Sequence, residues 1–186
     1  MEADGLVVEL TGARAMAMAE DLPPLQAMRS PAGKPRPKYE VLHDGSEVKL
    51  GNVTLTAHLT PGHTPGCTTW TMKAQEGGRS YDVLIIGSVG VNAGTNLVGN
   101  PQLVSQYQQS FKILRAAHVD VPLGSHPAMY NLAEKYPKIA AGGANPFIDP
   151  TGYTNELTVQ ETAFQNELKR QQTEGPPPPQ IGRAHV

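Results

Sequence analysis

The feature that most constrains this chain is a short loop with a Pro-Gly pair on either side of a histidine. The first pair ends a β-favouring run over residues 53–59, and the second follows two residues after His63. Another β-favouring run covers 67–72. The pattern predicts a strand–loop–strand unit that holds His63 at its tip on a rigid backbone. Most loop histidines are only hydrogen-bonded side chains, so the loop alone leaves structural and functional interpretations open.

Composition excludes several classes of protein. The 186 residues suffice for one domain with a core, and the net charge of −2 lacks the basic excess of a nucleic-acid binder. The single cysteine, Cys67, rules out an intrachain disulfide and a cysteine-rich zinc site. No apolar run reaches the length of a membrane span, and the first residues lack the pattern of a signal peptide. We therefore expect neither nucleic acid nor membrane as a partner.

Alternating and apolar runs predict strands at 39–42, 48–50, 53–59, 68–74, 81–86 and 119–123. Asn100 and Pro101 suit the N-cap and first position of a helix, and apolar residues follow it at helical spacing. Five prolines make 21–38 an expected exposed loop, and 141–153 reads as a second loop. A Thr-x-x-Glu capping box at Thr158 predicts the start of the last helix.

Two of the six histidines are candidates for chemistry. His63 and His126 each follow an apolar strand within a loop marked by proline or glycine, which is where α/β folds place their sites. Without further information each of them would more often be structural than functional. The remaining four, His43, His58, His118 and His185, are interpreted as structural or as lying in the tail.

The residues on either side of His63 add to this interpretation. The segment Thr-Pro-Gly-His-Thr-Pro-Gly-Cys-Thr-Thr-Trp, residues 60–70, resembles the third-histidine loop of the metallo-β-lactamase superfamily. The longer form from residue 56 resembles the third subclass of class B β-lactamases. The resemblance implies an α/β fold, the αββα sandwich, and a periplasmic or secreted zinc hydrolase that opens β-lactam rings. It also implies that His63 and His126 are zinc ligands, one in each of two zinc sites.

Ser88 distinguishes between branches of the superfamily. It stands where thiolester hydrolases of the glyoxalase II kind carry an aspartate that bridges two metals, whereas the β-lactamase subclass has serine. By resemblance Ser88 and Asn92 are candidate contacts for a small β-lactam substrate, although both also read as ordinary loop residues. Another superfamily hydrolase, such as a lactonase or a thiolester hydrolase, stays open as an alternative.

The main zinc motif of the superfamily, His-x-His-x-Asp-His, does not occur in these 186 residues. We therefore expect residues 1–174 to form a partial domain that lacks the first part of the N-terminal sheet and is inactive alone. A scaffold without metal is the third alternative. Residues 175–186 contain four consecutive prolines and are expected to be a disordered tail. We hypothesise that 181–186 are not native.

Overall fold

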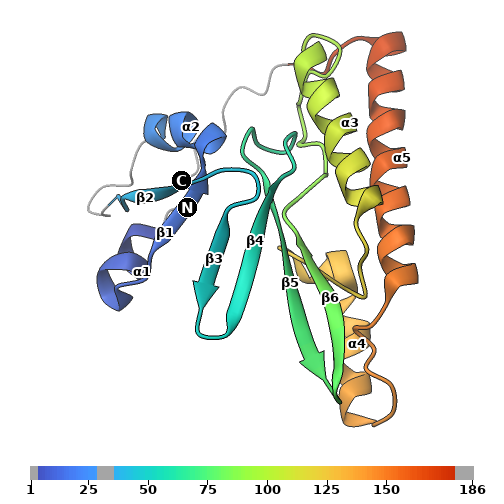
Figure 1. Ribbon diagram of the computed structural model, residues 1–186. Helices are drawn as coiled ribbons and strands as arrows, with labels where there is room; N and C mark the ends of the chain where they lie inside the picture. Colours follow the sequence, from blue (N-terminus) through green and yellow to red (C-terminus); the bar gives the residue numbers. More distant parts are fainter. Residues whose placement is uncertain (1–3, 29–35, 179–186) are drawn as a thin grey trace.

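A computed structural model describes residues 4–28 and 36–178, and Figure 1 shows two sheets between outer helices. The first sheet pairs β1 (Ala15–Met18) in parallel with β2 (Tyr39–Leu42), and it lies with α1 (Asp4–Thr11), η1 (Ala19–Asp21) and α2 (Leu22–Ala27). The second sheet has the order β3 (Glu47–Leu50), β4 (Val53–Leu59), β5 (Thr68–Glu76), β6 (Arg79–Ile86) and β7 (Val121–Gly124). The other helices are α3 (Pro101–Ala116), η2 (Pro127–Tyr130), α4 (Leu132–Ala140) and α5 (Pro150–Glu174).

Two apolar clusters hold these layers together. Met18, Leu42 and Ala57 are buried between the two sheets, with Trp70 packed against them. The larger cluster joins β6 to α3 and α5, which run side by side in Figure 1. Phe164 of α5 is 1% exposed, and its ring stacks on Tyr107 of α3 at a centroid distance of 5.1 Å. Burial of apolar surface on both faces of the five-stranded sheet therefore fixes the layer order.

The prediction of the helix after Asn100 is confirmed. The Asn100 side chain accepts a hydrogen bond from the Leu103 amide at 3.1 Å, and Pro101 takes the first helical position. The apolar stripe supplies three buried residues, Tyr107, Phe111 and Leu114. The local capping and periodicity signals were sufficient to predict this helix, because they agree with the tertiary packing.

The predicted start of the last helix is wrong. Helix α5 begins at Pro150, and its N-cap Asp149 accepts a hydrogen bond from the Gly152 amide at 2.8 Å. Thr158 lies inside the helix, where its hydroxyl donates to the Thr154 carbonyl instead of capping. Within the predicted loop 21–38, α2 is also helical, because its two prolines stand in the first turn, where no amide donor is needed.

The expected fold class is confirmed: an α/β sandwich whose first sheet has two strands among the described residues. No helix in the described ranges is long and apolar enough to span a membrane. Helix α5 ends at Glu174. The hypothesis about 181–186 lies outside the described residues.

Candidate metal centre

The loops that carry the candidate residues leave the five-stranded sheet at one edge. Parallel pairing sets Ile86 at the end of β6 opposite Gly124 at the end of β7. Antiparallel pairing sets Leu59 at the end of β4 opposite Thr68 at the start of β5. The segments that contain His63, Ser88 and His126 therefore begin at the same edge of the sheet.

His63 is held from both its ring and its backbone. Its Nδ1 lies 2.8 Å from the Gly90 carbonyl oxygen, and the Asn92 amide Nδ2 donates to the His63 carbonyl at 3.1 Å. A histidine that binds a metal commonly donates its second ring nitrogen to such a carbonyl, which fixes the tautomer and aims the other nitrogen. The geometry leaves Nε2 of His63 for a ligand.

Asp21 anchors the same loop from the first sheet's side of the molecule. Its two carboxylate oxygens accept from the Thr64 hydroxyl at 2.9 Å and from the Gly66 amide at 2.7 Å. Gly66 is needed because a Cβ there would lie 2.7 Å from Cγ of Asp21. Asp21 could not be predicted from the sequence, since a contact across more than 40 residues leaves no local pattern.

Helix α3 supports the loop from the other side. The buried Ser110 hydroxyl donates to the Pro61 carbonyl at 2.6 Å, and the Tyr107 hydroxyl donates to Gly90 at 3.2 Å. Burial raises the pKa of Tyr107 to about 12, so this phenol remains a protonated donor at neutral pH. Gly62 has φ +138°, and a Cβ there would lie 2.8 Å from the Tyr107 ring. Helix α3 thus fixes the backbone that precedes His63, at Pro61 and Gly62.

The other three candidates differ in how firmly they are held. Ser88 is half-buried, and its carbonyl accepts from the Cys67 thiol at 3.3 Å. His126 is exposed and forms the N-cap of η2. Asn92 is exposed, and its amide holds the His63 backbone as described above. The structure brings the loops of His63 and Asn92 into direct contact and sets the His126 loop at the same edge.

The donor set at this edge does not suffice for zinc. A catalytic zinc site takes three protein ligands plus water. Among the described residues, the only group of three close donors is Asp82, His118 and Asp120, and it contains neither His63 nor His126. One imidazole per site binds zinc weakly, so the described chain by itself does not fit either zinc ion of the family.

The group of Asp82, His118 and Asp120 lies at the opposite end of β6 and β7, and its members already bind one another. Asp82 pairs with Lys73 and accepts from His118 Nδ1 at 3.0 Å, and its amide donates to Asp120 at 2.8 Å. Hydrogen bonding from Lys73, and then from His118, lowers the pKa of Asp82. The ion pairs account for this cluster without a metal, because Lys73 and His118 already occupy the Asp82 carboxylate.

A buried glutamine of α5 holds the loop that follows Asn92. Gln171, 1% exposed, accepts from the Leu97 amide and donates to the Thr95 carbonyl, both at 2.8 Å. Its amide also donates to Glu167 at 2.8 Å, and Glu167 is paired with Arg170. Hydrogen bonds from Arg170 and then Gln171 lower the pKa of Glu167 to about 2. This network ties the loop after β6 to the outer helix.

The Glu167 network predicts a pH dependence. A carboxyl group with a lowered pKa stabilises the fold above its ordinary value near 4.5. That contribution is lost as the pH falls toward 2. Urea unfolding at several pH values should therefore show that Glu167→Gln is less stable than the parent at pH 7 and converges with it below pH 4.5. A stability difference that persists at pH 2 would contradict this assignment.

Comparison with solved structures places these observations in a family. The chain is 39% identical to the FEZ-1 metallo-β-lactamase from Legionella gormanii, with a TM-score of 0.84 over 92% of this chain and 71% of that one. It is 31% identical to BJP-1, a subclass B3 metallo-β-lactamase of Bradyrhizobium japonicum, with a TM-score of 0.81 over 94% of this chain and 70% of that one. SMB-1, solved with mercaptoacetic acid, is 25% identical, with a TM-score of 0.81 over 91% and 70% of the two chains. No family model matches the sequence. The chain belongs to the metallo-β-lactamase family of hydrolases.

Proposed function

We propose that this protein belongs to the zinc-dependent hydrolases that open the β-lactam amide of penicillins, cephalosporins or carbapenems in the periplasm. The observation that carries the proposal is the His63 loop, whose ring is oriented through Gly90 in the manner of a metal ligand. In this assignment His63 and His126 each contribute one imidazole to one of two zinc ions. The likeness to FEZ-1 and BJP-1 supports this reaction class over lactone or thiolester hydrolysis.

Two polar residues complete the proposed substrate edge. Ser88 follows the end of β6 and presents a half-buried hydroxyl that forms no hydrogen bond to another described residue. We propose that this hydroxyl contacts the substrate. Asn92 holds the His63 carbonyl, so its first role is to position the loop, and contact with substrate is its second.

We also expect that the 186 residues alone are not an active enzyme. Lowering the pKa of a bound water to about 7 requires a tightly held zinc ion, and the described donors do not hold one. We expect that the chain alone shows no metal-dependent turnover of nitrocefin, a chromogenic cephalosporin. Metal-dependent turnover is the part of the activity that a chelator abolishes. FEZ-1 serves as the positive control under the same zinc concentration.

A chimera tests the hydrolase assignment itself. The part of FEZ-1 that has no counterpart here would be joined to this chain, to supply the metal ligands that we propose the described residues lack. Turnover of nitrocefin by the chimera, with loss of at least about 100-fold in the His63→Ala version, is the expected result because catalysis depends on the metal. A folded chimera that binds zinc but leaves nitrocefin intact would overturn the β-lactamase proposal.

A further inference from the structure

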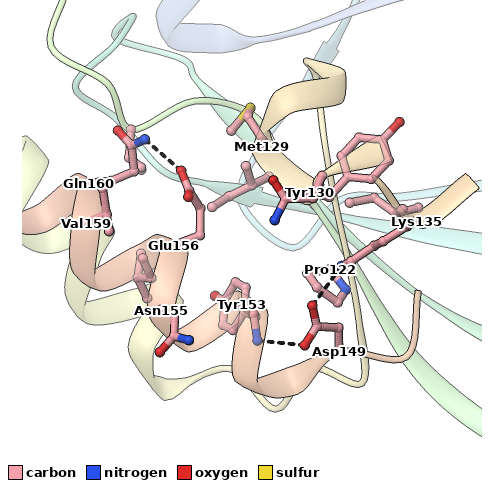
Figure 2. Close-up of a pocket in the computed structure, with 16 residues that line it drawn as sticks. Pro122, Met129, Tyr130, Lys135, Asp149, Tyr153, Asn155, Glu156, Val159 and Gln160 are labelled. Carbon is pink, nitrogen blue, oxygen red and sulfur yellow. Dashed lines mark hydrogen bonds and ion pairs between the residues drawn. The ribbon is translucent and has the colours of Figure 1, made fainter. Parts of the chain in front are cut away.

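A pocket of about 190 Å³ lies beside the larger core, and neither His63 nor His126 is among the residues that line it. Its walls come from the ends of β6 and β7, the turn η2 and the inner face of α5, as Figure 2 shows. A cavity of about 150 Å³ in another protein is large enough for one benzene molecule. The pocket is therefore large enough for a single ring or a short branched chain.

The floor of the pocket is apolar. Ile86, Val89, Tyr153 and Leu157 line it, and each is at least nine-tenths buried as a member of the larger core. Met129 of η2 closes one side. Displacing water from such a surface favours an apolar body of the matching size.

An ion pair occupies one end of the pocket. Lys135 is buried, and its ammonium group lies 2.8 Å from Oδ2 of Asp149. Asp149 also caps α5, and hydrogen bonding from Lys135 lowers the pKa of this carboxyl group, so Asp149 is ionised at neutral pH. This end offers a ligand neither a free cation nor a free anion.

The other end carries a carboxylate that no cation neutralises among the described residues. Glu156 is half-buried and accepts from the Gln160 amide at 2.8 Å. Figure 2 shows both side chains on α5 at the far side of the pocket from Lys135 and Asp149. A half-buried charge that meets only a neutral amide is less completely solvated than in water, and a charge-assisted hydrogen bond would stabilise it.

We propose that this pocket binds a small organic ammonium ion, with its apolar body on the core floor and its charged nitrogen at Glu156. Charge complementarity selects the cation, because Lys135 is already paired and Glu156 is the unmatched charge. An anionic molecule of the same size would place its charge against Glu156 or Asp149 and is excluded by repulsion.

The test compares three probes of similar size: benzylamine, benzyl alcohol and benzoate. Amide chemical-shift titration at neutral pH would report their affinities for the parent chain and the residues affected. We expect benzylamine to bind about fivefold or more tightly than benzyl alcohol, the gain that one charge-assisted contact provides. Shifts should concentrate on α5 and η2, and benzoate should not bind.

Two matched variants assign the preference to Glu156. Glu156→Gln keeps the shape of the side chain and removes its charge, so benzylamine and benzyl alcohol should then bind equally. Glu134→Gln makes the same change in net charge on α4 at an exposed position outside the pocket lining, and it should retain the preference. Unfolding curves confirm that both variants fold. Equal affinity of the two probes for the parent, no binding of benzylamine, or an unchanged preference in Glu156→Gln would each overturn the proposal.

Discussion

Replacing Asp21 with alanine is expected to lower the free energy of unfolding by about 3 kcal/mol, because two hydrogen bonds to a charged acceptor are lost together. The Thr64 hydroxyl can turn to water. The Gly66 amide belongs to a buried residue and would be left without its partner. The cost should therefore exceed that of an ordinary surface substitution. Urea unfolding followed by circular dichroism measures it directly.

Glu20→Ala supplies the control for this result. Glu20 is the neighbouring carboxylate and is exposed, so its removal should change the stability by less than about 0.5 kcal/mol. Asp21→Asn should fall between the two, because its single amide oxygen can keep one of the two hydrogen bonds. If Asp21→Ala were as stable as Glu20→Ala, the described anchor of the His63 loop would be wrong.

The strands and α3 were predictable because their local signals agree with the burial that tertiary packing requires. The start of α5 was not, since two N-terminal signals compete within one stretch. Asp149 followed by Pro150 is a cap, and the Thr-x-x-Glu pattern at Thr158 is another. Sequence alone does not say which one is used, and the longer helix wins because Tyr153 and Leu157 bury against the core.

The candidate centre was predictable in part for the same reason. Strand ends and turn-forming loops place the segments of His63 and His126 at one edge, and the resemblance to the family predicts that both bind zinc. The groups that fix His63 come from Asp21, Ser110 and the Gly90 carbonyl, which are distant in sequence. Nothing in a single sequence marks such contacts. The pocket beside Glu156 escaped prediction too, because it arises where α5 meets η2 and the ends of two strands.

Our central claim is that this chain does not bind zinc tightly by itself. The Gly90 carbonyl orients the imidazole of His63, and the described residues do not bring His63 or His126 together with enough donors for a zinc site. The orientation of His63 by Gly90 does not depend on a metal being bound, because it is a hydrogen bond within the protein. The loop can therefore retain the geometry of a ligand without binding zinc tightly.

The most direct test is the zinc content of the purified 186-residue chain after saturation with zinc and dialysis against metal-free buffer. The account predicts well below one zinc per chain by elemental analysis, since a stable site needs three or four protein ligands. The same residual amount should remain in a His63→Ala, His126→Ala double variant that shows the parent's circular dichroism spectrum. Retention of one or two zinc ions per parent chain, lost in the double variant, would contradict the claim.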